Sequence, residues 1–322
     1  MNYQTLGRTG LQVSTLALGT GNFGTRWGYG AEPDAARAIF DAYVDAGGNF
    51  IDTADVYQFG QSEEIVGKLL DGRRDDFVLA TKFANGAVPE PGRLATGNSR
   101  RTMVAAVEAS LKRLGTDRID LYWVHHPDAF TPAEEIVRGL DDLARAGKIL
   151  YAGLSNFPAW RLARAATLAE LTRAVPIAAA QFEHSLVHRE PEADLIPATR
   201  ALGLAAVTWS PLGGGVLTGK YRKGETGRKE GFGGRVFQPE DSALRTATVD
   251  AVLAIAGEID TSPDRVAIAW AATHGAIPII GPRSIEQATS NLGASALALS
   301  RDQIARLDAA SGSTRARATP AA

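Results

Sequence analysis

Eight short apolar runs recur along the chain, and a stretch with helical spacing of apolar residues follows each of them. This alternation predicts parallel strands joined by helical crossovers. We expect strands at residues 16–18, 50–52, 77–81, 119–125, 150–154, 177–181, 204–209 and 277–280. We expect helices at residues 33–46, 62–70, 100–114, 132–146, 158–171, 191–202, 263–274 and 284–292. Eight such units close into a (β/α)₈ TIM barrel of the α/β class.

Two features flank the predicted barrel. The first residues form a short β-hairpin, and a long loop follows the seventh strand. Residues 213–240 of that loop are rich in Gly, Lys and Arg and lack a clear period, so they form either a mobile cover over a site or a disordered insertion. Because no linker divides the chain, we expect one barrel domain over residues 1–310 and a flexible tail at residues 311–322.

Composition narrows the class of protein. A formal net charge of −2 gives no electrostatic reason to bind nucleic acid or an anionic membrane. The absence of cysteine excludes disulfides, thiolate catalysis and cysteine–zinc sites. The first residues lack the pattern of a signal peptide, and no apolar run reaches the length of a membrane helix. We therefore expect a cytoplasmic protein that acts on a small molecule, with an oligomeric state that the sequence leaves open.

Polar residues end the predicted strands. The C-terminal ends of barrel strands meet on one face, where barrel enzymes build their sites. One such residue has a simple structural reading, since Asp52 could cap a helix. Seven strand ends that converge on one face favour a site instead. These ends are Asp52, Lys82, His125, Ser155-Asn156, Gln181, Ser210 and Arg283.

Four of the polar groups suit proton donation. A phenol is a poor acid at neutral pH, and a nearby ammonium stabilises its phenolate. Tyr57 and Lys82 supply that pair, Asp52 would keep the lysine charged, and His125 could orient a carbonyl. We expect a proton-donating site with no nucleophile and no metal, which suits a reaction in which the hydride comes from another molecule.

Seven motifs in order make the chain resemble the aldo-keto reductases over about residues 3–299. They are "NFIDTADVY", "VLATKF", "RIDLYWVHHPD", "YAGLSNF", "AAQFEHSLVHRE", "TWSPLGGGVLTGKY" and "IPIIGPRSIEQATSN". The resemblance implies reversible hydride transfer between NADP(H) and an aldehyde, ketone or alcohol. It makes Tyr57 the general acid, tuned by Lys82 and Asp52, with His125 orienting the substrate.

The resemblance also implies a cofactor site. Ser155, Asn156 and Gln181 would hold the nicotinamide carboxamide, and Trp209 would stack on the ring. Arg283 at a helix start would take the adenosine 2′-phosphate. Gly281 would lie with Arg283 at the 2′-phosphate, and Gln287 and Asn291 toward the adenine. The remaining expected cofactor contacts are Gly19, Thr20 and Asn22 at the end of the first strand, and Ser210, Pro211, Leu212, Gly213, Gly214, Leu217 and Lys220 after the seventh strand. Trp27, Tyr29, Phe83, His126 and Phe232 are candidate substrate contacts, although aromatic residues in loops can equally serve packing.

Three other functions remain open on the sequence. The stretch "GTGNFG" matches a dinucleotide fingerprint, but no helix starts directly after it, as a Rossmann-type dehydrogenase requires. A metal-dependent hydrolase could use His125, His126, His184 and His188, although no acid-rich cluster accompanies them, and we expect no metal. A regulatory subunit with the same fold could bind cofactor without turnover.

Overall fold

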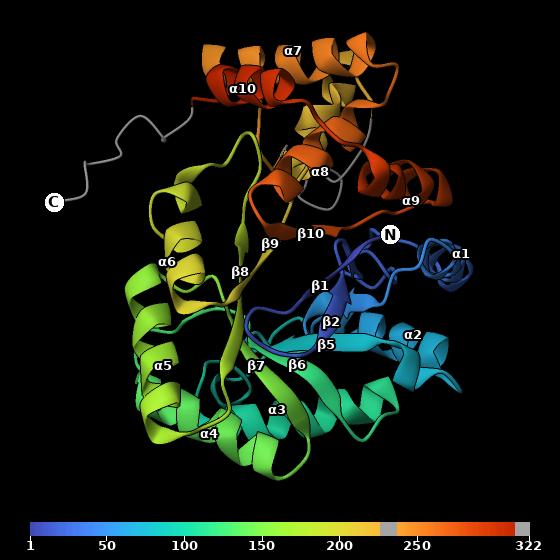
Figure 1. Ribbon diagram of the computed structural model, residues 1–322. Helices are drawn as coiled ribbons and strands as arrows, with labels where there is room; N and C mark the ends of the chain where they lie inside the picture. Colours follow the sequence, from blue (N-terminus) through green and yellow to red (C-terminus); the bar gives the residue numbers. More distant parts are fainter. Residues whose placement is uncertain (226–236, 313–322) are drawn as a thin grey trace, which may run out of the picture.

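The computed structural model describes residues 1–225 and 237–312. Eight parallel strands form a closed barrel in the order β10-β3-β4-β5-β6-β7-β8-β9 (Figure 1). The strands are β3 (Ala17–Gly19), β4 (Phe50–Asp52), β5 (Val78–Phe83), β6 (Ile119–Val124), β7 (Ile149–Ser155), β8 (Ile177–Glu183), β9 (Ala205–Trp209) and β10 (Ala276–Ile280). The predicted (β/α)₈ barrel is confirmed, and a Rossmann sheet is excluded.

A two-stranded antiparallel hairpin precedes the barrel, as predicted, and consists of β1 (Tyr3–Thr5) and β2 (Gln12–Ser14). Leu6 and Val13 from this hairpin are fully buried in the same apolar cluster as the inward-facing strand residues. The hairpin turn at Gly7 packs against the backbone at the end of α6 (Leu195–Leu202), because a Cβ added at Gly7 would lie 2.7 Å from the Gly203 carbonyl oxygen. The hairpin therefore closes the N-terminal end of the barrel and leaves the opposite end open.

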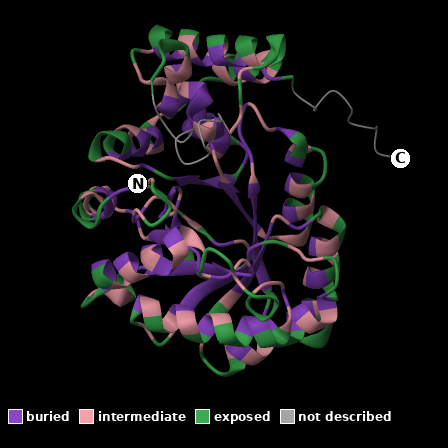
Figure 2. Ribbon diagram, turned by 180° about the vertical axis from the view of Figure 1, so that it is seen from behind, coloured by how far each residue is buried: buried purple, intermediate pink, exposed green. Residues whose placement is uncertain are grey.

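Helices surround the barrel with their buried faces against the strands and their exposed faces outward (Figure 2). Pro33 and Pro263 occupy first turns, where a missing N–H costs nothing. Gly115 and Gly203 end helices in the left-handed conformation. The helices are α1 (Pro33–Asp45), α2 (Gln61–Leu70), α3 (Arg100–Leu114), α4 (Ala133–Arg145), α5 (Ala159–Thr172), α6 (Leu195–Leu202), α7 (Ala243–Glu258), α8 (Pro263–Thr273), α9 (Ile285–Leu292) and α10 (Arg301–Ala310).

Helices α7 and α10 were not among the predicted helices. They lie side by side beyond α8 (Figure 1). Val249 and Leu307 are fully buried there, in one apolar cluster with Leu217 of the connection after β9. This second core fastens part of that connection, which begins with short 3₁₀ turns at Gly213–Thr218 and Lys220–Lys223. The site-facing loop is thus anchored at its start rather than being irregular throughout.

The first residue of the predicted tail, Ser311, packs against the barrel domain. Ser311 is buried, and its hydroxyl accepts a hydrogen bond of 2.6 Å from Arg189 Nη1. The rest of the expected tail, residues 313–322, lies outside the described residues.

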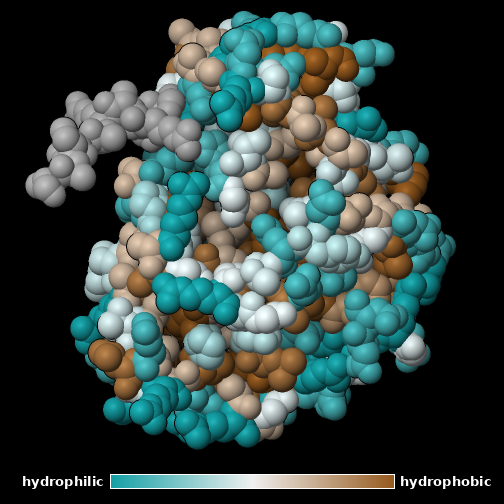
Figure 3. Space-filling view, in the orientation of Figure 1, coloured by the Kyte–Doolittle hydropathy of each residue, from teal (hydrophilic) through white to brown (hydrophobic). Residues whose placement is uncertain are grey.

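Polar and charged side chains cover most of the face in Figure 3, with apolar side chains interspersed among them. Large exposed apolar residues, such as Phe130 and Leu171, lie on separate loops and helices. No helix within residues 1–225 and 237–312 is long and apolar enough to cross a membrane.

Candidate active site

A cavity of about 900 Å³ opens where the strands end. It extends from the end of β4, past β8 and β9, to the start of α9. Most of the predicted site residues line it, although they come from every part of the chain. These residues are Gly19, Asn22, Trp27, Tyr29, Asp52, Tyr57, His125, His126, Asn156, Gln181, Trp209, Ser210, Pro211, Leu212, Gly214, Lys220, Gly281, Arg283, Gln287 and Asn291.

A buried ion pair lies next to the phenol. Lys82 on β5 is fully buried and pairs with the carboxylate of Asp52 at the end of β4. Its Nζ also donates to the Thr53 carbonyl at 2.8 Å and lies 3.1 Å from Tyr57 Oη. Burial lowers the pKa of Lys82, but the charge of Asp52 and the phenol raise it, and the net pKa lies above the ordinary value. The lysine is therefore a fixed ammonium aimed at the phenol oxygen.

The second oxygen of Asp52 extends this pair across the barrel. Gln181 Nε2 on β8 donates to Asp52 Oδ2 at 2.9 Å. The carboxylate thus fixes the ammonium on one side and the amide on the other. A buried charge pair with further hydrogen bonds is rigid, because either partner alone would be strongly disfavoured in the interior.

His125 lies across from Tyr57, with ring centroids 5.9 Å apart in an edge-to-face arrangement. Burial, Lys82 and His126 together hold the pKa of His125 well below its usual range, so its imidazole is neutral at physiological pH. Asn85 Nδ2 lies 3.3 Å from His125 Nδ1. The adjacent His126 stacks on His125 at 4.6 Å and also lines the cavity.

Asn156 links β6, β7 and β9 at the middle of the cavity. Its Oδ1 accepts from the indole N–H of Trp209 at 3.1 Å, and its Nδ2 donates to the His125 carbonyl at 2.9 Å. Asn156 and Ser210 both have φ near +60°, which is uncommon for residues other than glycine. Phe237 lies against Trp209 with ring centroids 6.0 Å apart. A flat aromatic surface thus lies next to oriented amides.

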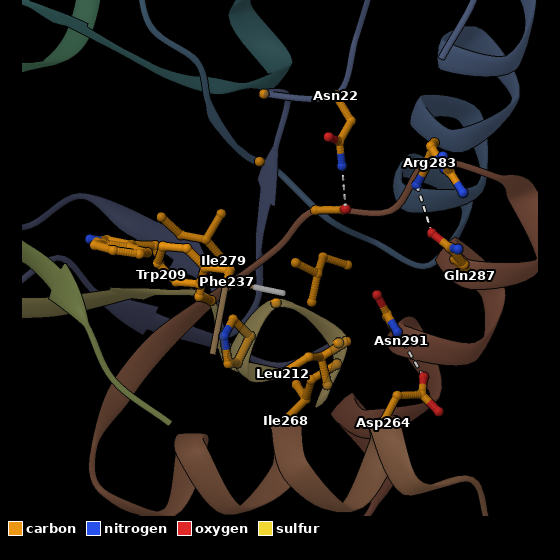
Figure 4. Close-up of a pocket in the computed structure, with 18 of the residues that line it drawn as sticks. Asn22, Trp209, Leu212, Phe237, Asp264, Ile268, Ile279, Arg283, Gln287 and Asn291 are labelled. Atoms are coloured by element: carbon orange, nitrogen blue, oxygen red, sulfur yellow. Dashed lines mark hydrogen bonds between the residues drawn. The ribbon is translucent and has the colours of Figure 1, made fainter. Parts of the chain in front are cut away.

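The start of α9 forms the far end of the cavity (Figure 4). Asn22 Nδ2 donates to the Gly281 carbonyl at 2.8 Å, and the backbone N–H of Arg283 donates to Gln287 Oε1 at 2.9 Å. Asn291 Nδ2 donates to Asp264 Oδ2 at 2.7 Å. The guanidinium of Arg283 lies over the ring of Tyr29 at 4.6 Å. A cationic side chain at a helix start suits an anionic group such as phosphate.

Several predicted contacts lie behind the lining instead. Phe83 does not line the cavity, because it is fully buried and stacks on Tyr122 at 5.1 Å. Leu217 likewise packs in the apolar cluster with α7 and α8. Thr20 and Ser155 are buried under the lining and bond to Ser62 and Asn156, and Gly213 is closed off by Val187. Lys82 itself lies beneath Tyr57. Phe232 lies outside the described residues.

The structure also places residues at the cavity that the sequence did not single out. Phe237, Asp264 and Ile268 line it, as does Gly215. Phe237 lies five residues after Phe232, the aromatic residue that the sequence singled out in this loop and that lies outside the described residues. Asp264 and Ile268 belong to α8. Their spacing in the sequence does not distinguish residues that line a cavity from residues that pack in the core, so their position could not be predicted.

The four histidines considered for a metal-dependent hydrolase do not form a metal site within the described residues. His184 is fully buried, with its Nε2 3.0 Å from Glu192 and its ring stacked on Trp270. Across residues 1–225 and 237–312, no group of three or more His, Asp or Glu residues is placed to hold a metal ion.

Comparison with known proteins identifies the family that has this arrangement. The model of the aldo/keto reductase family matches residues 15–311. The chain belongs to the aldo/keto reductase family. Its homologues include the uncharacterized oxidoreductase YrpG of Bacillus subtilis, 36% identical over 319 residues, which cover 96% of this chain and 95% of that protein.

Two other relatives show how names diverge within the aldo/keto reductases. An NADP(+) aryl-alcohol dehydrogenase of Phanerodontia chrysosporium is 35% identical over 316 residues, or 92% of this chain and 82% of that protein. A probable voltage-gated potassium channel subunit beta of Oryza sativa is 36% identical over 285 residues, or 85% of this chain and 84% of that protein. Family membership thus supports an oxidoreductase, and the specific activity depends on the residues of the site.

Proposed function

We propose that this protein is an NADPH-dependent reductase of aldehydes or ketones, reversible toward the alcohol, with Tyr57 as general acid and base. One observation carries the proposal. The phenol oxygen of Tyr57 lies 3.1 Å from a fully buried, paired ammonium at one end of a cavity that also holds Arg283 at the start of α9. An ammonium beside a phenol favours the phenolate left after proton donation.

The four polar groups have separate tasks in this proposal. Tyr57 donates its proton to the carbonyl oxygen during reduction and accepts one from the alcohol in the reverse direction. Lys82 stabilises the phenolate, and Asp52 keeps Lys82 charged and in place. His125 is neutral and can donate a hydrogen bond from its ring to the same carbonyl oxygen without competing for the proton. His126, Trp27 and Tyr29 are proposed to contact the rest of the substrate.

The residues along the cavity fit a nicotinamide dinucleotide. Trp209 offers a flat face, and Asn156 and Gln181 offer amides beside it. Gly214 and Gly215 line the cavity and have positive φ, and their lack of a side chain lets the backbone approach a pyrophosphate near Lys220. Arg283 would pair with the 2′-phosphate, and Gln287 and Asn291 would lie toward the adenine. When bound, the cofactor supplies the hydride.

The chain's own contribution is to orient the substrate and protonate it. Asp52 bonds both Lys82 and Gln181, so one carboxylate holds the ammonium that contacts Tyr57 and one of the proposed amide contacts. This shared contact would fix the position of the phenol relative to the nicotinamide. Holding reacting groups in the right geometry lowers the activation barrier.

The test is turnover by the purified protein. NADPH carrying deuterium at both C4 positions should be oxidised in the presence of a panel of aromatic and aliphatic carbonyls, and one deuterium should appear on the former carbonyl carbon. Binding of NADPH without oxidation by any carbonyl would contradict the proposal. That result would instead favour a regulatory subunit that only binds the cofactor.

A further inference from the structure

The chain turns in an unusual way directly after Tyr57. Gln58 and Phe59 have φ of 51° and 52°, and Gly60 follows with φ of 86°. Left-handed backbone is costly for residues with a side chain and persists where the surroundings enforce it. The buried member of the non-glycine pair is Gln58, which is completely inaccessible to solvent.

The amide of Gln58 makes three hydrogen bonds, all to the loop at residues 20–31. Its Nε2 donates to the carbonyl of Tyr29 at 2.8 Å and to that of Gly21 at 3.3 Å. Its Oε1 accepts from the backbone N–H of Trp27 at 2.8 Å. The loop packs closely on this amide, because a Cβ added at Gly30 would lie 3.1 Å from Nε2. One buried side chain therefore holds both ends and the middle of the loop.

This loop forms one wall of the cavity between its two ends. Trp27 meets Tyr57 edge-to-face, with ring centroids 6.2 Å apart. Tyr29 lies under the guanidinium of Arg283 at 4.6 Å. Asn22 reaches the Gly281 carbonyl, as Figure 4 shows. The segment that Gln58 holds thus contacts both the phenol and the proposed phosphate site.

A second glutamine holds the same loop on its outer side. Gln61 Oε1 accepts from the backbone N–H groups of Thr25 and Arg26 at 2.9 and 3.1 Å. Neither residue lines the cavity, and Arg26 has a further ion pair with Glu64 at 2.9 Å. Gln61 is consequently a matched control, since it bonds the same loop at positions that do not face the site.

We propose that Gln58 is a positioning residue, which sets the substrate-facing wall by fixing the backbone at Trp27 and Tyr29 relative to Tyr57 and Arg283. The inference rests on the proposed function for its kinetic consequence. Its structural part, that Gln58 determines the order of this loop, does not require turnover. The strained turn is then the means by which Gln58 is aimed at the loop rather than along the helix that follows.

The experiment compares Gln58→Ala with Gln61→Ala. Amide-resolved hydrogen exchange on the protein without cofactor should show protection at Trp27 reduced by about tenfold or more in Gln58→Ala, with Thr25 and Arg26 affected by less than about twofold. Gln61→Ala should give the reverse pattern. With NADPH and a carbonyl that the wild type reduces, Gln58→Ala should raise KM about tenfold and change kcat less, whereas Gln61→Ala should leave both within about twofold.

Gln58→Gly guards against a failure to fold, because glycine accepts the left-handed turn without strain while still removing the amide. It should reproduce the exchange and KM changes of Gln58→Ala. Unchanged protection at Trp27, or an unchanged KM in both Gln58 variants, would overturn the proposal. If the wild type reduces no carbonyl, the proposed function fails, while the exchange comparison still decides whether Gln58 orders the loop.

Discussion

At the scale of single residues, Arg283 should decide cofactor choice. It stands at the start of α9, on the side of the cavity away from Tyr57. A charge-assisted hydrogen bond contributes about 1.5–3 kcal/mol, so Arg283→Ala should weaken NADPH binding by roughly 10- to 100-fold. NADH lacks the 2′-phosphate, so its affinity should change little. Titration of both cofactors by fluorescence measures this, and equal losses would place the phosphate elsewhere.

Asp55 is a second residue with a measurable consequence. Its Oδ1 is buried without a hydrogen-bond partner. Burial and the neighbouring Glu63 raise the pKa of Asp55 to about 7, although Arg113 opposes them. The unfolded chain has a carboxyl pKa of about 3.9, so the folded state resists ionisation and loses stability as the pH rises from about 4 to about 7.

Asp55→Asn should therefore raise the free energy of unfolding on the order of 2–4 kcal/mol at about pH 8, and far less at about pH 4.5. Urea denaturation at the two pH values measures the difference. Asp71→Asn, which removes an exposed carboxylate, should show no such pH-dependent gain. A loss of stability in Asp55→Asn at the higher pH would show that the ionised carboxylate is favoured in the folded protein.

At the scale of secondary structure elements, Arg189 fastens α10 to the segment after β8. Its Nε and Nη2 each donate to Glu192 at 2.8 Å, its Nη2 lies 3.1 Å from Asp308, and its Nη1 donates to Ser311 at 2.6 Å. Replacing one partner of a buried ion pair typically costs about 3–5 kcal/mol, so Arg189→Leu should lower the free energy of unfolding by that amount.

Arg306→Leu is the matched control for the α10 prediction. Arg306 belongs to the same helix and pairs with Glu258 at the surface. Exposed pairs contribute little, so this variant should unfold almost as the wild type does in urea. Similar losses of unfolding free energy in the two variants would contradict the prediction, because they would show that the buried network stabilises α10 no more than the surface pair does.

The elements also show how far sequence reasoning extends. The barrel strands were predictable because each is an apolar run followed by a helix with regular spacing and a Pro or Gly signal. Helix α7 was missed because it follows the irregular loop and its apolar residues, such as Val249 and Ile255, do not stand out from an apolar background. Helix α10 is short and largely polar, with Leu307 as its buried anchor.

The site was predictable to the extent that strand ends reveal it. Asp52, Lys82 and His125 end apolar runs, so their convergence follows from the barrel. Phe83 was a candidate substrate contact as an aromatic residue next to Lys82, but strand residues alternate between two faces, and Phe83 packs on Tyr122 away from the cavity. Gln58 gave no signal, because its importance comes from a backbone turn and a loop that only the folded chain brings together.

At the scale of the whole molecule, the barrel separates two tasks along one cavity. Tyr57 after β4, Lys82 on β5 and His125 after β6 form the proton-donating end, and Arg283 stands before α9 at the other end. A substitution at one end of the cavity should therefore leave the function of the other end unchanged. Chemistry and cofactor affinity should be separable by single substitutions, which is unexpected for a protein that only binds the cofactor and has no chemical step to lose.

The most direct test of this account is Tyr57→Phe, which removes the phenol oxygen and keeps the ring. Carbonyl reduction should fall by about 10²- to 10⁴-fold in kcat, because the proton donor is lost. The dissociation constant for NADPH, measured by fluorescence titration on the same samples, should stay within about twofold of the wild-type value. Wild-type rates of carbonyl reduction by Tyr57→Phe would contradict the assignment of Tyr57 as the general acid.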